Sequence, residues 1–101
     1  MALDFHRLDN KEHIFGLDDK QFEALSEIFE EFKYRTGLTI DQYSDFKMTK
    51  ENQLAIIKII DEYISKNDLN RNKFKTIAII EFRLFLLLLS SKNIDLKLIG
   101  D

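Results

Sequence analysis

The chain has 101 residues, of which 45% are hydrophobic and 33% charged, and its formal net charge is −3. This length and composition predict one folded domain over residues 1–101 and exclude disordered or collagen-like architectures. Because the chain has no cysteine, disulfides, thiol nucleophiles and cysteine-ligated zinc sites are excluded as well.

The N-terminal residues predict a β-hairpin. Residues 2–8 place Leu3 and Phe5 on one face of an extended chain and polar side chains on the other, which is the period of a half-buried strand. Turn-forming residues follow at positions 9–12, and a second short apolar run occupies residues 13–17.

The first helix is predicted between Asp18 and Gly37. Asp18 and Gln21 have the spacing of a capping box, and Gly37 is placed to end the helix. The apolar residues are spaced three and four apart on one stripe, and they are Phe22, Leu25, Ile28, Phe29 and Phe32.

A loop is predicted from Leu38 to Met48, where polar turn formers alternate irregularly with apolar residues. Connections of this length are functional more often than short ones. Thr49 is expected to cap a second helix that ends near Asn67, because the apolar residues between them recur with helical periodicity.

A third helix is predicted from Lys73 to Ser91, and it is apolar on nearly all sides from Ile77 onward. A helix of this kind is typically central and covered on several sides. We therefore expect a set of its side chains to be buried, namely Phe74, Ile77, Leu84, Phe85 and Leu88.

The chain closes with residues 94–98, in which apolar and charged residues alternate, and we predict a strand there. A lone strand would leave its backbone groups unpaired, so it is expected to join the N-terminal hairpin. The predicted fold is α+β, mainly α, with three helices packed on a small antiparallel sheet in the order ββαααβ.

Export and membrane insertion are not expected. Charges at Asp4, Arg7 and Asp9 interrupt the apolar stretch that a signal peptide requires. The most apolar segment, Thr76 to Leu89, contains two charged residues and is shorter than the ~20 apolar residues of a membrane span. A cytoplasmic protein is therefore expected.

The sequence contains no recognisable catalytic, cofactor or metal motif. The spacing of its serines and glycines matches no nucleophile elbow, P-loop or HExxH pattern. His6 and His13 are expected side by side on the hairpin, where two imidazoles could begin a metal site, but their spacing matches no metal motif and we expect solvent-exposed strand residues instead. We expect a non-enzymatic protein without cofactor or metal, although abundant carboxylates leave an enzyme with a carboxylate site as an alternative.

Charge is distributed unevenly along the chain. Residues 1–64 have eight basic and fourteen acidic side chains, a net of −6, whereas residues 65–101 have seven and four, a net of +3. Acidic residues recur along the first helix and the following loop, where one negative surface would steer a basic partner. The candidate partner-binding residues are Glu23, Glu27, Glu30, Glu31, Asp41, Tyr43 and Asp45. A solvated helix face would explain the same charges.

Nucleic-acid binding is not expected. Lys66, Arg71, Lys73 and Lys75 surround the start of the third helix with Phe74 among them. The sequence pI near 5.4 opposes binding to a polyanion, and a solvated connection has the same composition.

Residues 16–47 resemble small bacterial immunity proteins that accompany secreted or contact-delivered toxins. The likeness consists of a short LDF strand, an acidic capped helix that ends in TG, and the loop from Ile40 to Asp45, which reads IDQYSD. The resemblance implies an acidic, non-enzymatic protein that binds a cognate toxin, often a basic nuclease, and blocks it.

Two functional hypotheses follow. The first is an immunity or inhibitor protein that neutralises a cognate basic toxin, such as a nuclease, through the acidic surface. The alternative is a structural or assembly subunit that forms a homodimer through an exposed apolar face of the second or third helix, since the second helix has more apolar positions than one stripe needs.

Overall fold

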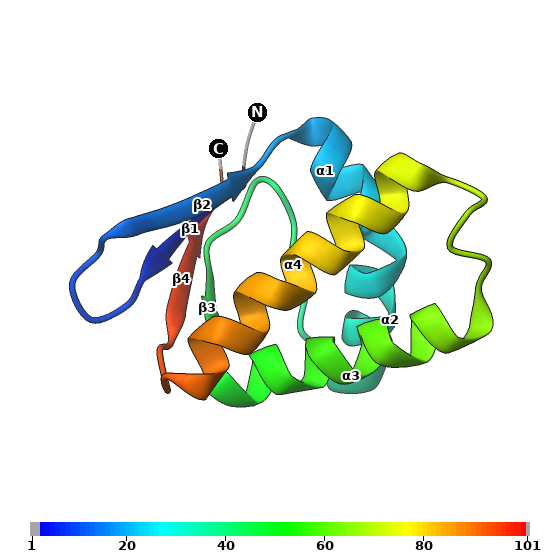
Figure 1. Ribbon diagram of the computed structural model, residues 1–101. Coiled ribbons are helices and arrows are strands. Elements are labelled where there is room, and N and C mark those ends of the chain that lie inside the picture. The colour runs from blue at the N-terminus through cyan, green and yellow to red at the C-terminus, as the bar shows by residue number, and fades with distance from the viewer. Residues whose placement is uncertain (1–2, 101) are drawn as a thin grey trace.

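The computed structural model of the protein describes residues 3–100, in which four helices accompany a four-stranded antiparallel sheet (Figure 1). In chain order the elements are β1 (Leu3–Arg7), β2 (His13–Leu17), α1 (Asp19–Ala24), α2 (Ser26–Thr36), β3 (Phe46–Met48), α3 (Lys50–Lys66), α4 (Lys73–Ser91) and β4 (Leu96–Ile99). The predicted α+β class, mainly helical with a small antiparallel sheet, is confirmed. Residue 2, which the predicted first strand included, lies outside the described residues.

The sheet joins the two ends of the chain. Its strand order is β2-β1-β4-β3, so the C-terminal strand pairs with the N-terminal hairpin as predicted. Strand β3 was not predicted, because its three residues were assigned to the loop. A segment this short shows no clear alternation, and it becomes a strand because β4 provides a partner, with Phe46 opposite Leu98 and Met48 opposite Leu96.

The predicted first helix is interrupted at Leu25. This residue has φ −97° and ψ 2°, away from helical values, and its N–H donates to the carbonyl oxygens of both Gln21 and Phe22. Its side chain is fully buried. The chain therefore forms α1 and α2 in succession, and Leu25 enters the core between them.

The predicted helix ends are confirmed at three positions. Asp18 Oδ1 accepts a hydrogen bond from the N–H of Gln21 at 2.8 Å, and Gln21 Oε1 accepts one from the N–H of Asp18 at 3.0 Å. Thr49 forms the equivalent capping box at α3. Gly37 ends α2 with φ 76°, a left-handed conformation in which glycine lacks the steric penalty of other residues.

The core lies between the helices and one face of the sheet. Alternate sheet residues point into it and are fully buried, namely Leu3, Phe5, Met48, Leu96 and Leu98. From α4, Phe82 contacts Phe5 edge to face with ring centres 5.7 Å apart. The opposite face of the sheet is left open to solvent, with exposed Lys47 and Lys97 on it.

The prediction that α4 is central was wrong. Figure 1 shows α4 crossing the front of the molecule with no other element in front of it. Its buried side is formed by Ala78, Ile79, Phe82, Leu86, Leu89 and Ser90. The five residues expected to be buried are all exposed, namely Phe74, Ile77, Leu84, Phe85 and Leu88. The physical reason is that α4 has apolar residues on two opposite sides, and the rest of the described chain covers one of them.

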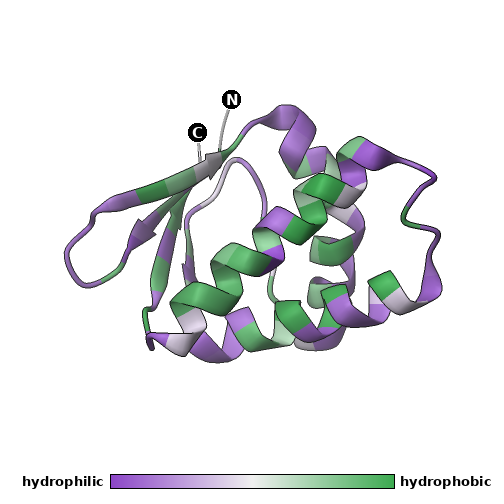
Figure 2. Ribbon diagram, viewed as in Figure 1, coloured by the Kyte–Doolittle hydropathy of each residue, from purple (hydrophilic) through white to green (hydrophobic). Residues whose placement is uncertain are grey.

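Figure 2 shows that most of α4 is coloured as hydrophobic, although the helix lies at the surface. Among residues 3–100, no helix combines the length and the hydropathy that a membrane crossing requires.

Candidate interaction surfaces

The predicted partner-binding residues lie on three consecutive segments. Glu23 is on α1, the other three glutamates are on α2, and Asp41, Tyr43 and Asp45 lie in the connection between α2 and β3. Glu23, Glu27 and Glu30 are exposed, whereas Glu31 is partly buried.

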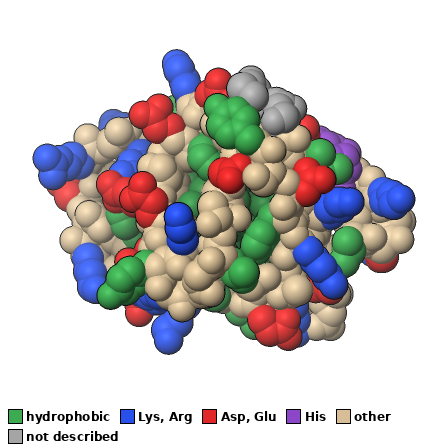
Figure 3. All heavy atoms as spheres, turned by 180° about the vertical axis from the view of Figure 1, so that it is seen from behind, with side chains coloured by type: hydrophobic (Ala, Val, Ile, Leu, Met, Phe, Trp, Pro, Cys, Tyr) green, Lys and Arg blue, Asp and Glu red, His purple; other side chains and the backbone are tan. Residues whose placement is uncertain are grey.

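Two of these glutamates form ion pairs with residues of the same chain. Glu27 Oε1 lies 3.1 Å from Lys75 Nζ on α4. Glu31 Oε2 accepts a hydrogen bond from Arg35 Nε at 2.7 Å, and the same guanidinium binds Glu62 on α3. The hydrogen bond from Arg35 lowers the pKa of Glu62. The hydrogen bond to Glu31, and to a smaller extent the one to Glu62, raises the pKa of Arg35. On the face in Figure 3, Lys and Arg side chains lie among those of Asp and Glu.

The two aspartates of the connection form structural hydrogen bonds. Asp41 Oδ1 accepts from the N–H of Tyr43 at 2.8 Å, which closes a local turn. Asp45 Oδ1 accepts from the N–H of Gly100 at 3.2 Å. A Cβ atom at Gly100 would lie 2.7 Å from the carbonyl oxygen of Gln42, so only glycine allows this close approach. Asp45 therefore holds the connection against the end of β4, beside the exposed Tyr43.

An apolar surface lies on the outer side of α4, as the homodimer hypothesis allowed, although several of its residues were expected to be buried. We call it the outer strip, and its residues are Phe74, Ile77, Ile80, Leu84, Leu87 and Leu88. Each side chain of the outer strip is between 40% and 58% exposed. The neighbouring Phe85 is excluded, because its ring stacks on Phe15 with centres 4.3 Å apart. The signal in the sequence was the recurrence of Ile77, Ile80, Leu84 and Leu87 at spacings of three, four and three.

Few charges lie near the outer strip. Lys73 and Glu81 are exposed on the same side of α4. Arg83 is directed away to α3, where its Nε donates to Asp61 Oδ1 at 2.7 Å. The first turn of α4 has no acidic residue, and its last turn has no basic residue. Lys73 is the first residue of the helix, where the positive end of the helix dipole disfavours a cation.

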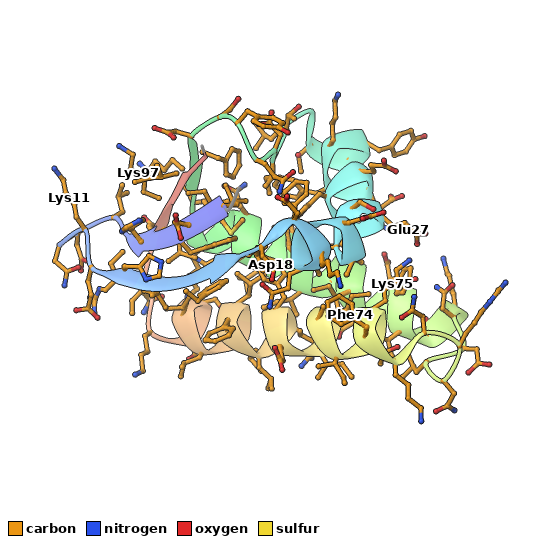
Figure 4. The ribbon with its side chains drawn as sticks, turned by 90° about the horizontal axis from the view of Figure 1, so that it is seen from above. Lys11, Asp18, Glu27, Phe74, Lys75 and Lys97 are labelled. Atoms are coloured by element: carbon orange, nitrogen blue, oxygen red, sulfur yellow. The ribbon has the colours of Figure 1, made fainter. Side chains whose placement is uncertain are left out.

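A hollow of about 470 Å³ lies between the end of α3 and the start of α4, and Tyr63, Asn67, Arg71 and Lys75 are among its lining residues. Lys75 points from α4 toward Glu27 (Figure 4), and its Nζ lies 5.4 Å from the centre of the Tyr63 ring. The interaction with Tyr63, and to a smaller extent the one with Glu27, raises the pKa of Lys75. The ammonium group is thus engaged by its own chain and ties α4 to α2 and α3.

The open face of the sheet brings basic residues from all four strands into one row. His13 is paired with His6, His6 with Lys97, and Lys97 with Lys47. His13 Nε2 lies 3.1 Å from Asp4 Oδ1, and the two imidazole rings meet edge to face. Figure 4 shows Lys97 on the side of the sheet away from α4. Within residues 3–100, no three His, Cys, Asp or Glu side chains are grouped so that they could hold a metal ion.

Comparison with known proteins identified no matching family model, no matching curated protein and no matching solved structure.

Proposed function

We propose that this protein is a non-enzymatic assembly subunit that pairs with a second copy of itself through the outer strip of α4. The observation that supports this function is the apolar surface of six large, half-exposed side chains on one side of a well-formed helix, with the exposed Glu81 on its flank. The largest apolar patch on a soluble protein is often the surface through which it binds a partner.

The area of the outer strip is sufficient for a dimer interface. With ~200 Å² for a large apolar side chain, the exposed fractions correspond to roughly 600 Å² per copy. This is at the upper end of the ~300–600 Å² that the largest patch on a typical monomer covers. Specific interfaces bury about 600–1,000 Å² per partner, so the outer strip would form the apolar centre of such an interface and Lys73 and Glu81 its rim.

Sedimentation velocity over a wide range of protein concentrations tests this function. We expect the wild type to be dimeric and Leu84→Lys to be monomeric, because the substitution would place two charges in the centre of the apolar contact. Leu54→Lys is a matched control, since Leu54 is an exposed leucine on α3 outside the outer strip. A wild-type protein that stays monomeric at all concentrations would contradict the proposal.

A second candidate is the immunity or inhibitor function, in which the acidic side of α2 binds a cognate basic toxin. Glu30 supports it: the residue is exposed, and no ion pair to it is present among residues 3–100. Tyr34, four positions later on the same side of α2, is 87% exposed, which provides an aromatic anchor beside the charge.

The binding affinity for the product of a neighbouring toxin gene tests this candidate. Glu30→Lys and Tyr34→Ala should each weaken the complex at least tenfold, whereas Glu51→Lys, an exposed glutamate on α3, should not. Unchanged affinity in both α2 variants would exclude this surface.

A further inference from the structure

We propose that the two copies pair with their α4 helices antiparallel, about a two-fold axis that crosses the outer side of α4 at the level of Phe82, whose own side chain points the other way into the core. In this arrangement Ile77 of one copy packs against Leu87 of the other, and Ile80 packs against Leu84. This inference rests on the proposed dimer and adds its direction and register.

The spacing of the outer strip favours helix-to-helix packing. The spacing is that of the a and d positions of a heptad, which form the seam between two helices packed side by side. These positions are occupied by Ile77, Ile80, Leu84 and Leu87. Residue numbers that face each other in an antiparallel pair have a constant sum. Ile77 with Leu87 and Ile80 with Leu84 share the same sum, so all four side chains find a partner in one register.

The flanking apolar residues support the antiparallel direction. Phe74 and Leu88 lie on the same side of the seam, near opposite ends of the outer strip, and both are about half exposed. Antiparallel pairing brings Phe74 of one copy beside Leu88 of the other, so both become covered. Parallel pairing would instead align each of them with the opposite flank of the second helix, where partly buried Arg83 and buried Ser90 lie.

The position of Lys73 supports the same direction. Lys73 is the first residue of α4, where the positive end of the helix dipole disfavours a cation. In the antiparallel pair it would lie near Ser91 of the second copy, at the end of that helix where the dipole favours a cation and beside a last turn that has no basic residue before the C-cap Lys92. In a parallel pair the two Lys73 side chains would face each other.

The pairing is closed, because each copy contributes the same surface to a two-fold interface. The outer strip of each copy is then fully used within the pair.

Disulfide trapping tests the direction directly, because the chain has no cysteine of its own. The variants are Ile77→Cys and Leu87→Cys, each folded according to its circular dichroism, oxidised either alone or after mixing in the reduced state. In the antiparallel pair, copies of the same variant hold their cysteines ~15 Å apart along the helix, beyond the ~7 Å between Cα atoms that a disulfide spans.

We expect the mixture to form at least ten times more covalent dimer than either variant alone. Leu54→Cys on α3 is the control and should not cross-link in any combination. Efficient cross-linking of Ile77→Cys with itself would overturn the antiparallel arrangement and leave the dimer intact. A monomer in sedimentation with no cross-linking in any sample would instead overturn the proposed dimer itself.

Discussion

Gln53 Nε2 on α3 donates a hydrogen bond to the carbonyl oxygen of Ile94 at 2.8 Å, and the Gln53 side chain is fully buried. The same amide nitrogen lies 3.5 Å from the carbonyl oxygen of Met48 at the end of β3. One buried side chain of α3 therefore links the end of β3 to the segment that leads into β4. Within residues 3–100, Gln53 Oε1 has no hydrogen-bond partner, so burying this amide oxygen costs free energy of folding.

Replacing Gln53 with alanine should destabilise the protein by about 2 kcal/mol, because it leaves the buried Ile94 carbonyl unpaired and opens a small cavity. Urea denaturation measures the change, with Lys58→Ala on the exposed side of α3 as the control. A loss as small as that of the control would show that the Gln53 contact contributes nothing.

The corrected orientation of α4 predicts a large loss of stability at one of its residues and almost none at another. Phe82 is almost completely buried and contacts the rings of Phe5, Phe15 and Phe29, so Phe82→Ala should cost about 3–5 kcal/mol.

Leu84→Ala, by contrast, should change the unfolding free energy of the monomer by less than ~0.5 kcal/mol. Denaturation at a concentration below that of self-association compares the two variants. Equal losses would indicate that the outer strip is covered within a single copy.

Glu81 is predicted to weaken the dimer. In the antiparallel register the two Glu81 carboxylates lie close to the two-fold axis and repel each other, so Glu81→Gln should tighten the dimer a few-fold, on the order of 0.5 kcal/mol. Sedimentation equilibrium at low salt and at 1 M salt measures the effect, which should shrink at high salt. Glu51→Gln on α3 serves as the control, and a Glu81→Gln dimer no tighter than that control would contradict the register.

The ion pair between Arg35 and Glu62 predicts a loss of stability in acid. The pKa of Glu62 is lowered from its ordinary value of 4.5 by the hydrogen bond from Arg35. The unfolded chain therefore binds a proton at Glu62 before the folded chain does, and the contribution of the pair is present above pH ~4.5 and is lost as the pH falls through the lowered pKa.

In an NMR titration the Glu62 carboxyl should have a pKa below that of an unpaired glutamate, and Arg35→Gln should return it toward the ordinary value. The stability of Arg35→Gln should also depend less on pH below 4.5 than that of the wild type. An unchanged Glu62 titration in Arg35→Gln would show that the pair is not formed in solution.

Several elements were determined by the sequence near them. Asp18 and Gln21 begin α1 because the side chain of each accepts a hydrogen bond from the backbone N–H of the other. Gly37 ends α2 because glycine adopts a positive φ without steric cost. The alternation of Leu3 and Phe5 predicts β1 for the same reason, since a two-residue period already defines the face that is buried. These signals act over a few residues and can be recognised without the rest of the chain.

Other features were decided only by tertiary structure. Lys47 and its neighbours form β3 because β4, far along the chain, supplies hydrogen-bonding partners. Glu27 of α2 forms an ion pair with Lys75 of α4, and this contact depends on how the two helices pack. Helical periodicity identifies both apolar sides of α4, but only the packing of the sheet and α3 against one of them leaves Leu84 and the rest of the outer strip exposed to a partner.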